Sequence, residues 1–145
     1  MEPSYATGLV WFRRDLRALD HAALYHALTQ CQQVHCVFVF DTDILAPLPR
    51  ADRRVEFIRE SLVELDTHLR ELSGHTQGGL IVLHAAAVDA VPQLAQALGV
   101  NAVFTNHDDE PQALQRDNAV RTQLARNGVA MHTYKDHTVL ERDEV

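Results

Sequence analysis

Three arginines and an aspartate follow the first apolar run of the chain. Residues 9–12 (LVWF) lead directly into Arg13, Arg14, Asp15 and Arg17. Guanidinium groups recognise anionic or planar polar ligands, because they present several N–H donors in a fixed plane. A solvated charged loop explains the spacing equally well. The position at the end of a predicted strand favours ligand recognition.

Acidic residues follow two other apolar runs. Asp41 ends the second run, and residues 108–110 (DDE) follow the fourth. The carboxyl ends of parallel strands meet at one edge of a sheet, so these groups and the arginines predict a mixed-charge crevice there. Carboxylates could accept hydrogen bonds from ring N–H or hydroxyl groups, and Arg14 and Arg54 could hold oxygens or stack on a ring. Each acidic residue alone is more simply a helix cap or turn former.

The motifs of several common enzyme classes are absent. The sequence has no GxGxxG, no GxxxxGK[ST], no HExxH and no GxSxG. This disfavours NAD enzymes, P-loop enzymes, zinc proteases and serine hydrolases. Cys31 and Cys36 lack CxxC or zinc-ligand spacing, and we interpret them as inert free thiols of a cytoplasmic protein. No metal site is predicted.

Asp117 falls on an apolar stripe. It lies three residues before Val120 and seven before Leu124, which places it on the same face of a helix. A carboxylate on that face needs a buried partner, so we expect a structural salt bridge with an arginine. The neighbouring Arg116 is expected to point away from the stripe.

Short apolar runs alternate with amphipathic stretches. The predicted strands are residues 9–12, 34–40, 80–83, 102–104 and 129–134. The clearest helix follows Arg53, and its apolar stripe is Val55, Ile58, Leu62, Leu65, Leu69 and Leu72. Asp20 is expected to cap a helix carrying Leu24 and Leu28, while Pro92 and Pro111 are expected near the starts of two others. This alternation predicts a Rossmann-like α/β fold, a doubly wound five-stranded parallel sheet of order 3-2-1-4-5 with helices on both faces.

Composition limits the function classes further. The 145 residues suit one domain, and a net charge of −7 disfavours the phosphate backbone of a nucleic acid as the main partner of this surface. No apolar run approaches the roughly 20 residues of a membrane span, and the first residues, MEPSYATG, do not resemble a signal peptide.

Four segments in this order resemble the amino-terminal domain of the photolyase and cryptochrome family. They are LVWFRRDLRALDHAAL, VFVFDTDIL, RRVEFIRESLVELDTHLREL and HDDEPQALQRDNAVRTQLARNGV. The resemblance implies a flexible start at 1–7, an α/β antenna domain at 8–140, and at 141–145 the start of a linker to a helical FAD domain that is absent here.

In family terms, this domain holds a light-harvesting pigment, and the helical domain holds FAD and the damaged DNA. The resemblance implies an 8-hydroxy-deazaflavin or FMN as pigment. A folate is less favoured because Gln112 and Ala113 occupy the positions of the folate-binding Asn-Glu pair. The implied binding residues are Arg14, Asp41, Arg54 and Asp108, with Phe38 and Ile44 lining the pocket.

The leading interpretation is therefore the light-harvesting domain of a deoxyribodipyrimidine photolyase, which repairs cyclobutane pyrimidine dimers in DNA. The chain alone would bind pigment without catalysing repair, and its partner would be the helical domain of the same protein, with no membrane partner. A cryptochrome-type blue-light receptor is one alternative. A stand-alone nucleotide-binding domain of the stress-protein kind is another, and a Gly-rich phosphate loop would favour it.

Overall fold

The computed structural model describes residues 5–12, 21–41, 53–73, 79–107 and 111–134. Within these ranges the side chains of residues 40–41, 53–59, 72–73 and 111–113 are outside the description. Strands and helices alternate along the chain. They are β1 (Tyr5–Phe12), α1 (Ala22–Gln30), β2 (Cys31–Asp41), α3 (Arg53–Ser73), β3 (Leu80–Ala85), α4 (Ala87–Leu98), β4 (Ala102–Asn106), α5 (Pro111–Arg126) and β5 (Ala130–Tyr134).

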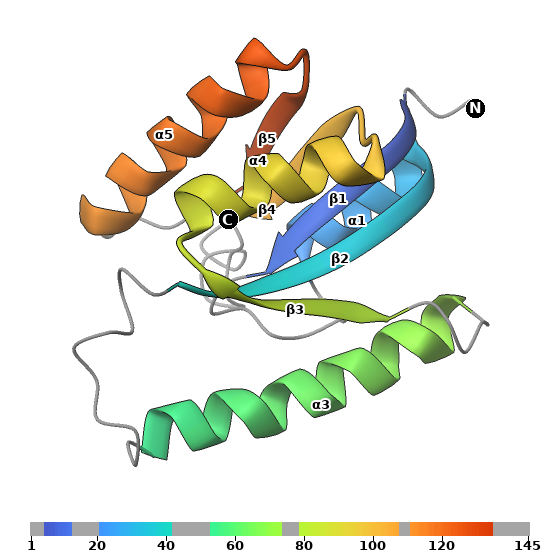
Figure 1. Ribbon diagram of the computed structural model, residues 1–145. Coiled ribbons are helices and arrows are strands. Elements are labelled where there is room, and N and C mark those ends of the chain that lie inside the picture. Colours follow the sequence, from blue (N-terminus) through green and yellow to red (C-terminus); the bar gives the residue numbers. More distant parts are fainter. Residues whose placement is uncertain (1–4, 13–20, 42–52, 74–78, 108–110, 135–145) are drawn as a thin grey trace, which may run out of the picture.

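The strands form one parallel sheet in the order β3-β2-β1-β4-β5, as predicted (Figure 1). The central strand β1 pairs with β2 on one side and with β4 on the other, so that Gly8 lies opposite both Val34 and Ala102. Strand β1 begins at Tyr5, four residues earlier than predicted, because its first residues pair with the start of β2. Residues 5–7, expected to belong to a flexible start, are therefore part of the sheet.

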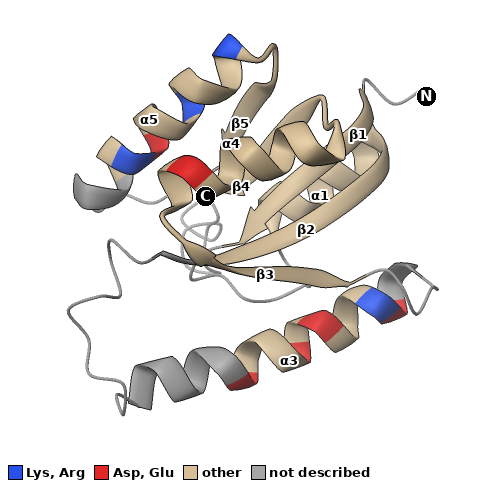
Figure 2. Cartoon of the chain, in the orientation of Figure 1, with Lys and Arg blue, Asp and Glu red and all other residues tan. Residues whose placement is uncertain are grey.

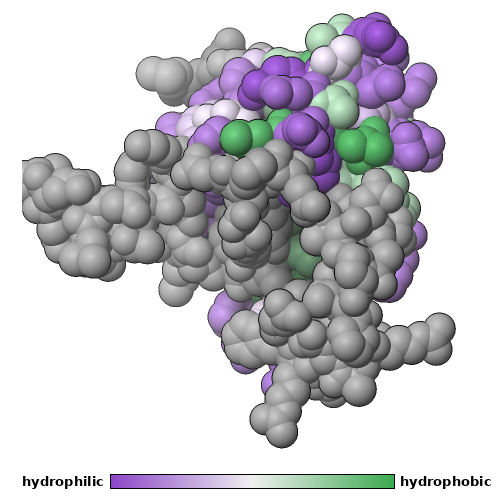
Figure 3. Space-filling model, turned by 90° about the vertical axis from the view of Figure 1, so that its left-hand side faces the viewer, coloured by the Kyte–Doolittle hydropathy of each residue, from purple (hydrophilic) through white to green (hydrophobic). Residues whose placement is uncertain are grey.

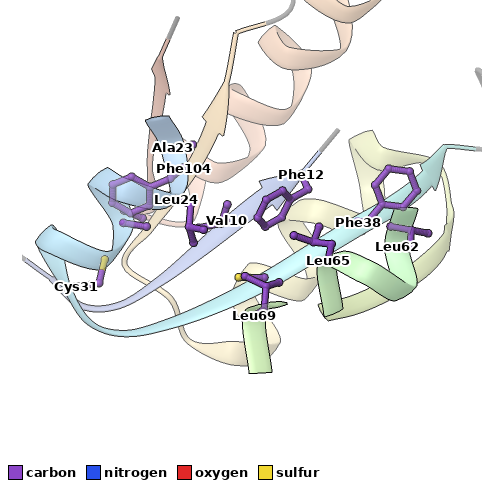
Figure 4. Close-up of a cluster of buried hydrophobic side chains, with 13 residues drawn as sticks. Val10, Phe12, Ala23, Leu24, Cys31, Phe38, Leu62, Leu65, Leu69 and Phe104 are labelled. Carbon is purple, nitrogen blue, oxygen red and sulfur yellow. The ribbon is translucent and has the colours of Figure 1, made fainter. Parts of the chain in front are cut away.

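Each face of the sheet carries its own hydrophobic cluster, because successive side chains of a strand point to opposite faces. Val10 and Phe12 of β1 face α1 and α3, whereas Leu9 and Trp11 face α4 and α5. All four side chains are buried. Figure 4 shows the first cluster, in which leucines of α3 approach the rings of the sheet. The sheet thus has helices on both faces, as predicted.

Helix α3 confirms the predicted apolar stripe where its side chains are described. Leu62, Leu65 and Leu69 are buried against the sheet, whereas Val63 on the outer face is 68% exposed. Spacings of three and four residues place the leucines on one face of the helix. The remaining predicted members, at 55, 58 and 72, lie outside the described side chains.

Helix α4 begins earlier than predicted. It starts at Ala87, so Pro92 lies inside the helix instead of near its start. A proline at this position removes one backbone hydrogen bond. Ala87, Ala90 and Val91 are buried in the second cluster, and this burial favours helix on both sides of the proline. The prediction about Pro111 is confirmed, since α5 starts there.

The two cysteines are buried free thiols. Burial raises the pKa of Cys36 to about 12, so this thiol stays protonated at neutral pH. No helix in the described part of the chain is long and apolar enough to cross a membrane.

Candidate binding site at the carboxyl edge of the sheet

The strand order places a switch point between β1 and β4. The helix that follows β1, α1, packs on one face of the sheet, and the helix that follows β4, α5, packs on the other. The connections therefore diverge at the carboxyl ends of these two strands, which is where open α/β sheets bind ligands. Phe12 ends β1 and Asn106 ends β4, so the two residues mark this edge.

A buried polar pair joins the edge to the start of α1. His21 and Asn106 are 3% and 4% exposed. The backbone N–H of Ala23 donates to Oδ1 of Asn106 at 2.9 Å, and the N–H of Leu24 donates to Nδ1 of His21 at 3.0 Å. The imidazole also packs on the ring of Phe12, with centroids 4.7 Å apart. These contacts tie together the end of β1, the end of β4 and the first turn of α1.

The side chains of His21 and Asn106 also approach each other. Nε2 of His21 lies 3.2 Å from Nδ2 of Asn106. His21 is the N-cap of α1. The helix was expected to be capped by Asp20, which lies outside the described residues, and Leu28, expected on its apolar side, is 52% exposed.

On the other face of the sheet, α5 brings a charged pair to the end of β1. Asp117 is 5% exposed, as its place on the apolar stripe predicted. Nε of Arg116 lies 3.8 Å from Oδ1 of Asp117, and its guanidinium carbon lies 5.3 Å from the centre of the Trp11 ring. The expectation that Arg116 points away is wrong. Its long side chain reaches a cation–π contact with Trp11.

Charge is unevenly distributed over the described helices. In Figure 2 the charged residues of α5 are mostly basic, and those of the coloured part of α3 are mostly acidic. Figure 3 views the side that lies at the left in Figure 1, where the described surface is largely hydrophilic with small hydrophobic spots. Arg116 belongs to this basic helix, but its charge is paired with Asp117.

The structure places only part of the predicted site. Phe38 is 6% exposed and belongs to the cluster under α1 and α3. Asp41 is the last residue of β2, and Arg54 is the second residue of α3; only their backbones are described. The other three predicted residues, Arg14, Ile44 and Asp108, lie outside the described residues. The composition of the predicted site thus stays a prediction.

Sequence reasoning missed His21, Asn106 and Arg116. His21 directly follows a predicted cap residue, and Asn106 is the last residue before the acidic cluster. Both positions adjoin recognised features, and a polar residue at a strand end or helix start is the signal that could have found them. Their mutual contact depends on the fold, because the two residues are 85 positions apart.

The described part of this edge is a buried frame around the ends of β1 and β4. The His21 imidazole packs on the Phe12 ring on one face of the sheet, and the Arg116 guanidinium lies over the Trp11 ring on the other face. Phe12, Trp11, His21 and Asn106 are each at most 4% exposed, so these four side chains stabilise the edge from within. Among the described residues, no three His, Cys, Asp or Glu side chains gather as a metal site would require.

Comparison with known proteins gives a consistent result. The family model for DNA photolyase matches residues 8–145. The deoxyribodipyrimidine photo-lyase of Synechococcus sp. is 31% identical over 137 residues, which are 94% of this chain and 28% of that protein. Cryptochrome-2 of Gallus gallus is 30% identical over 141 residues, which are 97% of this chain and 24% of that protein.

Solved structures agree with the sequence matches. An archaeal photolyase from Sulfolobus tokodaii, solved with two FAD molecules, superposes with a TM-score of 0.78 at 32% identity. The match covers 89% of this chain and 29% of that one. The chain spans about a quarter of the length of the relatives that it matches.

Proposed function

This chain belongs to the DNA photolyase family, and we propose that it is the light-harvesting domain of a deoxyribodipyrimidine photolyase. The observation that supports the proposal is the switch point between β1 and β4, where open α/β sheets of this order bind ligands. The match to the DNA photolyase family over residues 8–145 supports a pigment as that ligand. The net charge of −7 does not suit a DNA backbone.

The proposed pigment is an 8-hydroxy-deazaflavin or a flavin such as FMN, with a folate less favoured. The residues proposed to hold it are Arg14, Phe38, Asp41, Ile44, Arg54 and Asp108. The charged residues among them would bind the polar rim of the ring system and its side chain, and the two apolar ones would line its faces. When bound, the pigment absorbs light and supplies excitation energy to FAD. This chain's own contribution is to bind and orient the pigment and to keep water from its faces.

The parent protein is proposed to contain a carboxy-terminal helical domain that binds FAD and damaged DNA. The relatives are about four times as long as the matched segment, which supports such a partner within the same protein. Splitting of the pyrimidine dimer would occur in that domain, so the present chain alone is proposed to have no repair activity. A cytoplasmic location remains a prediction from the free thiols.

Titration of the chain with FMN, FAD and 8-hydroxy-5-deazaflavin tests pigment binding, with fluorescence quenching as the signal. We expect saturable binding of at least one of them, and weaker binding after Asp108→Ala. Glu60→Ala is the matched control, because it removes an exposed carboxylate from α3. Absence of saturable binding by any of the three compounds would refute the pigment-binding function.

A blue-light receptor of the cryptochrome kind is the second candidate. Cryptochrome-2 of Gallus gallus and the Synechococcus photolyase are almost equally identical to this chain. The full-length gene product, illuminated with DNA containing cyclobutane dimers, separates the two functions. Light-dependent loss of dimers supports the photolyase. A flavoprotein that leaves the dimers intact supports the receptor.

A further inference from the structure

Strand β5 lies at one end of the sheet and pairs with β4. All of its side chains are half-buried, whereas those of the neighbouring β4 are fully buried. An edge strand with little buried apolar surface can open while the rest of the domain stays folded, because local opening costs least free energy there. The side-chain contacts of β5 therefore decide how firmly this strand stays in the sheet.

On the side that faces α1, these contacts are made by rings. The hydroxyl of Tyr5 lies 2.9 Å from Nε2 of His132, and this hydrogen bond joins the first residue of β1 to β5. The ring of Tyr134 stacks on the ring of His26 in α1, with centroids 4.2 Å apart and planes 7° from parallel. The Phe104 ring of β4 contacts both β5 rings, with its centroid 5.2 Å from that of His132 and 6.4 Å from that of Tyr134. Side chains of β1, α1 and β4 thus hold the edge strand.

The surroundings of His132 oppose a positive charge on its imidazole. Burial is the main factor that lowers the pKa of His132, and the charge of Arg121 on α5 and the nearby His26 lower it further. The other titratable groups of this cluster are Tyr5 on β1 and Tyr134 on β5 itself. None of these four side chains is a carboxylate, which is the group that would stabilise an imidazolium.

Protonation of His132 therefore favours an open β5. The pKa of His132 in the closed strand lies below the ordinary value of about 6.5, so the open strand binds the proton more tightly. The stabilisation is fully present above about pH 6.5 and is lost as the pH falls through the pKa of the closed strand. The hydrogen bond with Tyr5 can survive protonation, because a hydroxyl both donates and accepts. The cost arises from a charge in a half-buried position that also feels the Arg121 guanidinium.

We propose that His132 is a pH switch for the edge of the sheet: its neutral imidazole holds β5 against β1 and α1, and its charged imidazole releases β5 at mildly acidic pH. The contacts that support the switch are the hydrogen bond between Tyr5 and His132 and the ring stack of His26 on Tyr134. The switch belongs to the chain itself and does not depend on pigment binding.

Amide hydrogen exchange of the whole chain, followed by NMR, tests the release. Protection factors, in which the intrinsic effect of pH is divided out, are compared at pH 7.5 and pH 5.0 for the amides of β5 that pair with β4. We expect these factors to fall by about threefold or more at the lower pH, and those of Val37 and Val39 in the inner strand β2 to change less. An equal fall in both strands would be a general loss of stability and would overturn the switch.

His132→Gln removes the titrating group and retains an amide that can bond to the Tyr5 hydroxyl. We expect the β5 protection factors of this variant to be nearly equal at the two pH values, whatever their absolute level. His68→Gln is the matched control, because it removes an exposed histidine from α3, and it should keep the full pH response. A pH response in His132→Gln as large as that of the unsubstituted chain overturns the proposal.

Arg121→Gln tests the electrostatic basis of the switch. The titration midpoint of His132, read from the Cε1–H resonance of its imidazole, should move to higher pH, because the Arg121 charge lowers the pKa. Arg121→Lys keeps the charge and should leave the midpoint close to that of the unsubstituted chain. An unchanged midpoint in Arg121→Gln contradicts the role of this charge. A midpoint above about 6.5 in the unsubstituted chain overturns the switch itself, because protonation would then favour the closed strand.

Discussion

Replacing Leu65 with alanine is expected to lower the free energy of unfolding by about 3 kcal/mol. The side chain is 1% exposed and lies between Leu62 and Leu69 in the cluster beneath α3 (Figure 4). Truncations of this kind cost about 2 to 5 kcal/mol, depending on how far the surroundings collapse. Helix α3 lies on one side of the sheet and can move toward it, so we place the cost in the middle of that range.

The corresponding change in melting temperature follows from the size of the chain. An unfolding entropy of about 2.1 cal/mol/K per residue gives about 0.3 kcal/mol/K for this chain, so a loss of about 3 kcal/mol lowers the melting temperature by about 10 °C. Urea and thermal denaturation, followed by circular dichroism, measure both quantities. Val63→Ala in the same helix is the matched control. Its side chain is 68% exposed, so its cost should stay within about 0.5 kcal/mol. Equal losses in the two variants would refute the assignment of the buried face.

Three further substitutions and treatments test other parts of the structure. The pKa of Asp66 is lowered by a hydrogen bond from the Leu80 N–H, and also by the hydrogen bond and the charge of Arg70. The ionised Asp66 therefore stabilises the fold at neutral pH, and this stabilisation is lost as the pH falls below about 4. In urea denaturation, the stability difference between the unsubstituted chain and Asp66→Asn should shrink from pH 7 to pH 3, and a constant difference would count against this contribution. Gly8→Ala would place a Cβ 2.5 Å from Sγ of Cys31, and thermal denaturation should show a loss of stability of about 1 to 3 kcal/mol. A second substitution, Cys31→Ala, removes the sulfur and should recover part of that loss. If the stability changes of the two substitutions simply add in the double variant, the contact is contradicted. Burial raises the pKa of Cys36 to about 12, so this thiol is protonated and unreactive in the folded chain at pH 8. In the variant Cys31→Ala, where Cys36 is the remaining thiol, a disulfide reagent at pH 8 should react only as fast as the protein unfolds.

The strand order was predictable because it depends on strong local patterns. Apolar runs and amphipathic stretches alternate along the whole chain, and right-handed crossovers leave few arrangements of five parallel strands. The ends of the elements were harder to predict. Strand β1 extends back to Tyr5 and β2 starts at Cys31, directly after α1, because these residues pair with each other. Such pairing depends on the fold, and the local composition contains no sign of it.

The start of α4 was predicted too late in the chain, because the prediction relied on Pro92. Local rules place proline in the first turn of a helix, but Pro92 lies inside α4. The alanines before it are good helix formers, and Ala87 and Ala90 are buried on the sheet. Burial of this face therefore outweighs the loss of one backbone hydrogen bond.

Local rules also failed for Arg116. The spacing along the helix gives the direction of its Cβ, but it does not show that the guanidinium reaches the Trp11 ring.

The site itself was only partly predictable. The sequence predicted a site at the carboxyl edge of the sheet, because arginines and carboxylates follow strands that end there. It did not reveal the pairing of His21 with Asn106, because residues 85 positions apart meet only through the order of the strands. Of the six predicted pigment residues, Phe38 is the only one whose side chain is described, and its burial follows directly from its place in an apolar strand.

The capping of α1 also bears on the choice between a pigment and a nucleotide. A Rossmann dinucleotide site binds phosphate with the free N–H groups at the start of the helix after the first strand. Here two of these N–H groups, those of Ala23 and Leu24, already donate to Asn106 and His21. Phosphate binding at this helix start would require both hydrogen bonds to break. A ligand at this edge is therefore bound by side chains and not by the N–H groups of the helix start. A stand-alone nucleotide-binding domain is therefore disfavoured on structural grounds as well as by the missing glycine loop. Titration with AMP and ATP should show no saturable binding, and chemical-shift changes at the Ala23 and Leu24 amides on adding either nucleotide would overturn this argument.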